Sequence, residues 1–482
     1  MVLKKQALKA TIWEFFGKIS GNIISFVFSI FLARLLNPDD FGTIAIISGI
    51  INISSSFWDA GLGSALIQRK EVDSAHYSSV QFFNVFIGLI LFMLFYFLAP
   101  YIAEFYDKTN LTTLFRVMSC LFFINSFGQV YRAKLRRNLD FSTITKTTLF
   151  GVIVGGAISV LMAYNGYGIW SLVTQFICSA TVSNCYLFFL MKEEKFSFVF
   201  SKQKLIELWD YGFKMFVTNI IEIIMSNLDS LAIGKLFSSS VLGMYYRAKS
   251  LNSFAIEYSA GSVMNVYFRI ASHYQNQLDN LYLIYKKISS ILLYFTCFVV
   301  GLLFVFSKDI ILIVFGEKWL GAHYYFSFIL ISSITTPLSY LALNTLSGAG
   351  KSRLMLKLKI ITKSILLVNL LFAFSFGIKG FMLGLIFATT INYFIESFAL
   401  SYVISFNYLN SIFILFKQVL LSGAIVFITY FIYQYLMFLL PILRLSIGVF
   451  AYSLFFLFIT FLFKIDGLTL IVEEIKKIRN KQ

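Results

Sequence analysis

Charged side chains lie inside segments of this chain that otherwise consist of Phe, Leu and Ile. The stretch "NLDSLAIGKLFSSSVLGMYYRAKS", residues 227–250, places Asp229, Lys235, Arg247 and Lys249 in or beside two long apolar runs. A charge in such surroundings costs several kcal/mol unless it faces water, a partner or a ligand. We therefore interpret the deeper charges as lining a functional cavity. These are Asp59, Glu222, Asp229, Arg247 and Glu257.

Polar and charged residues recur at helical spacing within four of the apolar segments. The spacing i, i+4, i+7, i+11, which is one face of a helix, is shared by two sets: Lys18, Asn22, Ser25 and Ser29, and Ser48, Asn52, Ser55 and Asp59. Two later segments carry similar arcs: Asn219, Glu222 and Asp229, then Arg247, Ser250, Ser253 and Glu257 with Lys249 at the flank. One shared, water-filled cavity explains all four stripes. The alternative is that Ser and Asn only join neighbouring helices, and that Lys18 only pairs with Glu14.

The composition is that of an integral membrane protein. The 482 residues have a mean hydropathy of +0.81, and only 13% are charged, about half the share in soluble domains. The net charge of +17 is scattered between apolar runs, so it indicates membrane topology and not nucleic-acid binding. The four Cys and three His residues lie singly, without metal-ligand spacing. We expect no metal, no cofactor and no catalytic site.

The apolar runs predict an all-α polytopic protein with about fourteen transmembrane helices. Lys and Arg gather in alternate connections, which places both termini in the cytoplasm. The N-terminus lacks a cleavage site for a signal peptide and is interpreted as a retained first helix. The predicted spans are 12–35, 41–62, 79–100, 112–132, 144–164, 168–190, 211–236, 241–268, 288–307, 322–347, 356–376, 379–404, 412–438 and 442–463.

An internal repeat indicates two related halves. "FLARLLNPDDFG" (residues 31–42) aligns with "AIGKLFSSSVLG" (232–243), and two further matches recur in the same order about 200 residues apart. We predict two pseudo-symmetric six-helix lobes and two appended helices. The predicted domains are an N-terminal lobe (1–191), a cytoplasmic linker (192–205), a C-terminal lobe (206–405), two appended helices (406–464) and a basic cytoplasmic tail (465–482).

No motif for nucleotide hydrolysis or other catalysis is found. "LSGAGKSRL" (residues 346–354) contains GKS but lacks the spacing of a phosphate-binding loop. No extramembrane segment is long enough to form a catalytic domain. We therefore predict a secondary transporter and not an enzyme.

Six motifs resemble those of a known family: "LARLLNPDDFG", "DAGLGSALIQRK", "RAKLRRNLDF", "SNLDSLAIGKL", "LGMYYRAKSL" and "FGEKW". They are similar, in matching order over residues 1–405, to the bacterial polysaccharide transporters. These are the Wzx-type flippases of the multidrug/oligosaccharidyl-lipid/polysaccharide exporter (MOP) superfamily, and the motifs resemble in particular those of the WzxC-like branch for colanic acid and capsule.

This resemblance implies two lobes around a central cavity that opens alternately to each side of the bacterial cytoplasmic membrane. The implied substrate is an oligosaccharide on a polyprenyl diphosphate, usually undecaprenyl diphosphate, and the implied partners are a polysaccharide polymerase and chain-length machinery. The implied contacts are Arg247, Lys249 and Lys18 for the diphosphate, and Asn22, Ser25, Asn52, Ser55, Asn219, Ser250 and Ser253 for the sugars. Asp59, Glu222, Asp229 or Glu257 would carry a coupling proton or sodium ion.

Two departures from the family pattern concern the eighth predicted helix. Lys249 stands where relatives commonly have an aromatic residue, and "VYFRIASHY" lacks a Pro that the family usually has. Three alternatives stay open. They are a multidrug antiporter of the same superfamily, which predicts an acidic cavity, a lipid II flippase, and a membrane polysaccharide polymerase or ligase.

Overall fold

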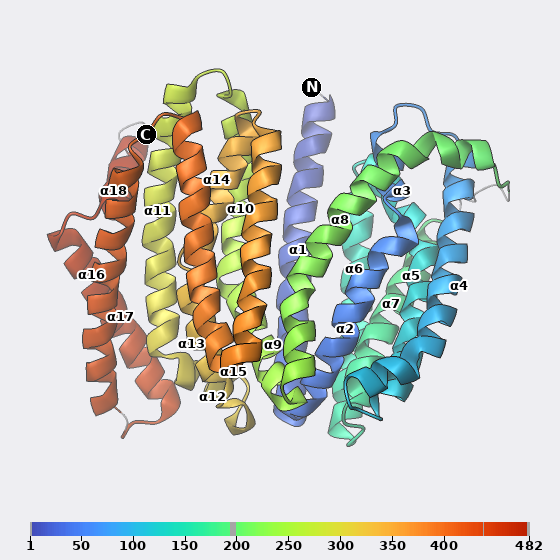
Figure 1. Ribbon diagram of the computed structural model, residues 1–482, viewed down its shortest axis with the longest axis horizontal. Helices are drawn as coiled ribbons and strands as arrows, with labels where there is room; N and C mark the ends of the chain where they lie inside the picture. The colour runs from blue at the N-terminus through green and yellow to red at the C-terminus, as the bar shows by residue number, and fades with distance from the viewer. Residues whose placement is uncertain (1, 193–198, 437, 480–482) are drawn as a thin grey trace. The chain divides into compact units, whose positions relative to one another are not determined.

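The computed structural model describes residues 2–192, 199–436 and 438–479, and within them side chains other than 2–8, 257–263, 265–266, 372–374, 474–475 and 477–479. Helices account for nearly all of the described chain, and no strand occurs in it (Figure 1). The first half contains α1 (Val2–Leu35), α2 (Pro38–Asp59), α3 (Leu62–Gln68), α4 (Ser74–Phe105), α5 (Leu111–Arg137), α6 (Phe141–Tyr164), α7 (Trp170–Leu190) and α8 (Lys202–Leu236). The second half contains α9 (Ser239–Asn252), η1 (Ser253–Glu257), α10 (Tyr258–His273), α11 (Leu278–Val305), α12 (Ser307–Val314), η2 (Glu317–Trp319), α13 (Ala322–Ser332), α14 (Thr336–Gly348), α15 (Ser352–Val403), α16 (Tyr408–Tyr435), α17 (Pro441–Leu462) and α18 (Asp466–Arg479).

The predicted all-α membrane fold is confirmed. Among the described residues, 12 helices are long and apolar enough to cross a membrane, and each matches one predicted span. The count of fourteen is not reached by this criterion. The other two predicted spans, 241–268 and 356–376, fall in α9–η1–α10 and in the first part of α15, which is interrupted at Gly377 with φ 66°.

Contacts divide the chain into two compact units, Met1–Gly243 and Met244–Gln482. In the first unit α1 packs on α6, α6 on α7, α4 on α5, and α2 on α8 (Figure 1). Small residues allow these helices to approach closely. A Cβ added at Gly88 of α4 would lie 2.7 Å from the Ser126 Cβ of α5. Such small-residue contacts are typical of helix pairs in membranes.

The second unit joins its two C-terminal membrane helices to α11 and α12. Aromatic rings of α11, α16 and α17 form one cluster that includes Tyr294, Tyr452 and Phe456. Beside it the fully buried Asp309 of α12 accepts hydrogen bonds from the Tyr433 hydroxyl and the Arg444 Nε, each at 2.7 Å. The carboxylate thus links α12 to both α16 and α17.

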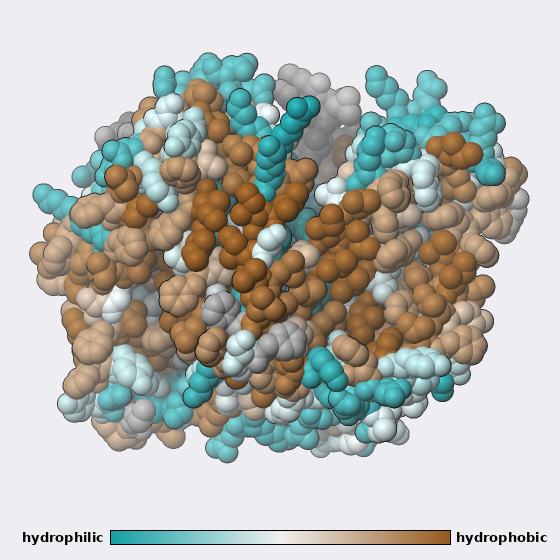
Figure 2. Space-filling view, in the orientation of Figure 1, coloured by the Kyte–Doolittle hydropathy of each residue, from teal (hydrophilic) through white to brown (hydrophobic). Residues whose placement is uncertain are grey.

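The surface of each unit has the polarity expected of a membrane protein. Hydrophobic side chains cover the middle of the helices on the face shown, and hydrophilic side chains gather at the helix ends (Figure 2). Lipid provides the matching environment for an apolar outer surface of this kind.

The two aligned repeat segments meet inside the first unit. A Cβ built on Gly42 would lie 1.8 Å from the Ser239 carbonyl oxygen, and one built on Gly243 would lie 1.9 Å from the Pro38 carbonyl oxygen. The start of α2 and the start of α9 therefore pack backbone to backbone. Only glycine permits this approach at both positions.

We predict that Gly42→Ala lowers the free energy of unfolding, because the added methyl group would overlap the Ser239 carbonyl oxygen, and relieving that overlap requires a shift of the backbone. The expected loss is about 1–3 kcal/mol, measured by thermal unfolding of the purified protein in detergent. Gly423→Ala is the matched control, since a Cβ at that helical position meets no atom within 4 Å. Equal stability of both variants would contradict the proposed role of the contact.

Candidate functional site

The residues predicted to line a cavity are divided between the two units. In the first unit Lys18, Asn52, Asn219 and Glu222 are exposed, and Asn22, Ser25, Ser55, Asp59 and Asp229 are half-buried. In the second unit Arg247 is buried, and Lys249, Ser250 and Ser253 are half-buried. Glu257 lies outside the side chains that the structure describes.

Helices α2 and α8, which carry part of this set, pack against each other. Leu231 of α8 lies over Gly49 of α2, and the Phe57 and Phe216 rings make an edge contact with centroids 5.1 Å apart. The second and seventh predicted spans therefore pack directly against each other. The shared cavity and the roles of its residues stay predictions.

Several of the predicted polar residues have local partners on their own or the adjoining helix. The Ser55 hydroxyl donates to the Asn52 carbonyl oxygen at 2.6 Å. The Asp59 carboxylate accepts from the Gly63 backbone N–H at 3.0 and 3.1 Å, at the start of α3. Asp59 thereby satisfies one of the backbone donors that a helix start leaves open.

Arg247 faces aromatic rings of the "FGEKW" motif. Its guanidinium carbon lies 5.9 Å from the Phe315 ring centroid and 6.0 Å from that of Trp319, and the residue is 5% exposed. Both distances are within the range of cation–π attraction. The Lys249 ammonium, at the flank of the same helix, lies 6.0 Å from the Tyr245 ring.

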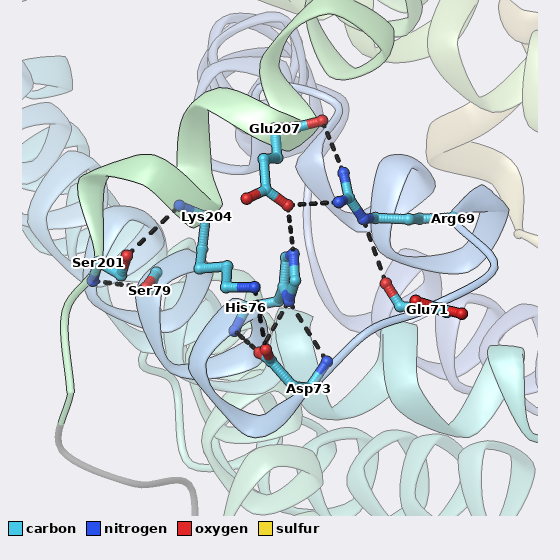
Figure 3. A network of polar contacts seen from close by, with 8 residues as sticks. All are labelled: Arg69, Glu71, Asp73, His76, Ser79, Ser201, Lys204 and Glu207. Atoms are coloured by element: carbon cyan, nitrogen blue, oxygen red, sulfur yellow. Dashed lines mark hydrogen bonds and ion pairs between the residues drawn. The ribbon is translucent and has the colours of Figure 1, made fainter.

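A polar network joins the α3–α4 connection to the start of α8 (Figure 3). Arg69 forms an ion pair with the Glu207 carboxylate and donates to the Glu207 carbonyl oxygen at 3.1 Å. His76, 3% exposed, lies between two carboxylates, with Nδ1 at 2.8 Å from Asp73 and Nε2 at 3.3 Å from Glu207. The start of α8 is thus held by contacts of Glu207 with both Arg69 and His76.

Two further contacts complete this network. The Lys204 ammonium pairs with Asp73 at 3.1 Å, and the Ser201 N–H donates to the Ser79 hydroxyl at 2.8 Å. The His76 backbone N–H and the Lys204 ammonium hold the pKa of Asp73 well below its usual range. Asp73 is ionised at neutral pH as a result.

The sequence of this chain matches a known protein family. Residues 31–323 match the model of the family described as "Polysaccharide biosynthesis protein". The chain belongs to that family. This confirms the resemblance derived from the motifs.

Two curated relatives in the polysaccharide biosynthesis group are distant in sequence. The succinoglycan biosynthesis transport protein ExoT of Rhizobium meliloti is 27% identical over 64% of this chain and 62% of its own. The lipopolysaccharide biosynthesis protein WzxC of Escherichia coli is 22% identical over 66% of this chain and 65% of its own. The matched region spans less than two thirds of the length of these relatives.

Two solved structures show the same fold. The lipid II flippase MurJ in an inward closed conformation superposes with a TM-score of 0.74 at 16% identity, over 94% of this chain and 98% of its own. An inward-facing MATE multidrug transporter of the MOP superfamily gives 0.59 at 16% identity, over 80% and 95%. The predicted MOP-type architecture is confirmed.

The motifs of this polysaccharide biosynthesis protein meet in contacting pairs. Arg137 of "RAKLRRNLDF" donates to the carbonyl oxygens of Arg69 at 2.6 Å and Lys70 at 2.7 Å, at the end of "DAGLGSALIQRK". Arg247 of "LGMYYRAKSL" contacts "FGEKW" differently, through the rings of Phe315 and Trp319. Sequence reasoning found these motifs but missed His76 and Glu207, whose separation of 131 residues gives no spacing signal.

We predict that Asp73→Asn destabilises the protein at neutral pH and that the difference from wild type disappears in acid. The pKa of Asp73 is lower in the folded than in the unfolded state, so its stabilising contribution is complete above about pH 4 and is lost as the pH falls further. Melting temperatures in detergent across this range measure it. Asp279→Asn, an exposed carboxylate at the start of α11, is the control. A pH-independent difference would contradict the assignment.

Proposed function

We propose that this protein is a flippase that moves a polyprenyl-diphosphate-linked oligosaccharide from the cytoplasmic to the outer leaflet of the bacterial cytoplasmic membrane. The cargo would be a repeat unit of capsule, exopolysaccharide or O-antigen. The family match over residues 31–323 carries this proposal, and the MurJ-like fold supports it because a lipid II flippase handles a lipid-linked glycan. A polysaccharide polymerase and chain-length machinery would act on the exported unit, and both termini would lie in the cytoplasm.

The diphosphate would bind to the cations Lys18, Lys249 and Arg247. Lys18 is exposed and Lys249 is half-buried, so both ammonium groups are accessible. Arg247 offers the planar fork of donors that matches phosphate oxygens. Because Arg247 is 5% exposed, it would bind in a state that separates it from the rings of Phe315 and Trp319.

The uncharged polar residues of the stripes would bind the sugar hydroxyls. Asn52 and Asn219 are exposed, whereas the remaining members are half-buried. The set is Asn22, Ser25, Asn52, Ser55, Asn219, Ser250 and Ser253. Transport would be coupled to a proton or sodium gradient through Asp59, Glu222, Asp229 or Glu257.

The rival functions differ in observable products. A multidrug antiporter of the same fold would carry organic cations, for which the basic Arg247 and Lys249 are unfavourable neighbours. A lipid II flippase would move only the peptidoglycan precursor. A polymerase or ligase would lengthen the glycan, and we propose instead that this chain performs no covalent chemistry.

Reconstitution tests the proposed function directly. We expect proteoliposomes containing undecaprenyl-diphosphate-linked oligosaccharide to expose the glycan to an impermeant sugar-oxidising reagent faster than protein-free liposomes, with a rate that depends on pH or sodium. Lipid II and a cationic dye serve as competing cargoes. Longer glycans found by mass spectrometry would support the enzyme and contradict the flippase.

We predict that Arg247→Ala abolishes export of the lipid-linked glycan while the protein stays folded in the membrane. Arg247→Lys keeps the charge without the planar fork, so it should retain part of the activity. Lys308→Ala, which removes an exposed cation from α12 of the same unit, is the control. Normal export by a stably expressed Arg247→Ala variant would exclude diphosphate recognition by this residue.

A further inference from the structure

A buried carboxylate in the second unit has no role in the functions proposed so far. Glu396 lies in the part of α15 that follows the break at Gly377 and is 3% exposed. Its Oε2 is buried and makes no hydrogen bond with any described residue. Such a group in a membrane helix is a candidate functional site.

A second unsatisfied oxygen lies on the same face of the helix. Asn392 precedes Glu396 by four residues, its Nδ2 donates to the Thr362 carbonyl oxygen at 3.4 Å, and its Oδ1 is buried without a partner. Residues at i and i+4 are neighbours on a helix. Two adjacent acceptors without a donor are unfavourable, and each costs about 1–3 kcal/mol of desolvation. A proton on Glu396 would supply the missing donor, because a protonated carboxyl carries one O–H.

Polar and charged groups near Glu396 come from α14, from the first part of α15 and from α11. Ser339 of α14 faces the carboxylate, and Lys359 and Lys363, on the first part of α15, place positive charge nearby. From α11, Tyr285 interacts electrostatically with Glu396. Tyr267 of α10 interacts with Tyr285 and hydrogen-bonds the Thr345 hydroxyl at 2.6 Å.

These neighbours favour a proton over a metal cation. The two lysines repel a bound metal cation. The described residues contain no group of three or more acidic, His or Cys side chains that could hold a metal ion. A proton, in contrast, can be held by the carboxyl group alone.

A small cavity with both polar and apolar lining residues lies next to this site. It has a volume of about 40 Å³ and is lined by Tyr285, Lys286, Ser289, Tyr393 and Ser411, among others. That volume is enough for more than one water molecule. Lys286 is the ninth residue of α11 and Ser411 lies in the first turn of α16, so the cavity lies toward the N-terminal ends of these helices.

Hydroxyl groups bridge the space between the cavity and Glu396. Tyr285 and Tyr393 line the cavity, and both face the hydroxyl of Ser397, the residue next to Glu396. The Ser397 hydroxyl is buried and forms no hydrogen bond in the geometry shown. Rotation of these hydroxyls, or one intervening water, would complete a chain along which a proton moves.

We propose that Glu396 is a proton-binding site that is loaded from this cavity and couples proton movement to transport. The carboxylate takes one proton from cavity water through the Tyr and Ser hydroxyls and later returns it, and no other bond changes. The coupling part rests on the proposed flippase function, whereas proton binding does not.

Infrared difference spectroscopy of the purified protein tests proton binding without any cargo. We expect the spectrum between alkaline and acidic buffer to contain the C=O band of a protonated carboxylic acid that is absent from Glu396→Gln. Glu396→Asp should retain a shifted band, and Asp279→Asn, which changes an exposed carboxylate on α11, should keep the wild-type band. An unchanged band in Glu396→Gln would overturn the site. A band that responds to sodium at constant pH would overturn the choice of a proton.

Transport in proteoliposomes tests the coupling. Glu396→Gln should lose the acceleration that a pH gradient gives to wild type, with the protein still folded by size-exclusion chromatography. Retained acceleration in this variant would overturn coupling by Glu396. If wild type moves no lipid-linked glycan at all, the flippase proposal fails, whereas the infrared result still decides whether Glu396 binds a proton.

Discussion

The backbone contact between Gly42 and Gly243 is the constraint on which the first unit depends. It brings the first turn of α2 against the first turn of α9, with each glycine facing a carbonyl oxygen of the other segment. Nearby, the Lys108 ammonium bonds the Ser239 hydroxyl, and Lys235 pairs with Asp107 at 2.8 Å. Helix α2 begins and helix α8 ends beside this backbone contact, and the two helices pack against each other. The contact therefore helps to position the polar residues of both helices.

Motifs that are far apart in sequence owe their composition to such contacts. Arg137 satisfies carbonyl oxygens at the end of α3, where the chain turns toward α4. Arg247 covers the rings of Phe315 and Trp319. Each arginine serves several acceptors or rings at once, which lysine cannot reproduce. The composition of a motif that identifies the family is therefore explained in part by packing.

The sequence predicted the membrane helices well because about twenty apolar residues per span leave a strong signal. The repeat was visible through glycines at equivalent places, and the structure shows those glycines in contact. The network of His76 and Glu207 was not predictable, since its partners are 131 residues apart and neither forms a motif. Asn392 and Glu396 have helical spacing, but a single pair is indistinguishable from one that joins helices. The pair is recognised only in the structure, where the Asn392 Oδ1 and the Glu396 Oε2 are buried without a hydrogen-bond donor.

The link from Asp309 to Tyr433 and Arg444 has a consequence for how the chain can vary in length. The two last membrane helices resemble an addition to a twelve-helix plan, yet they supply both partners of a carboxylate that is fully buried in α12. A chain ending after α15 would keep that acid without its counter-charge, a defect worth about 3–5 kcal/mol. The loss or gain of these helices during evolution therefore requires a simultaneous change at position 309.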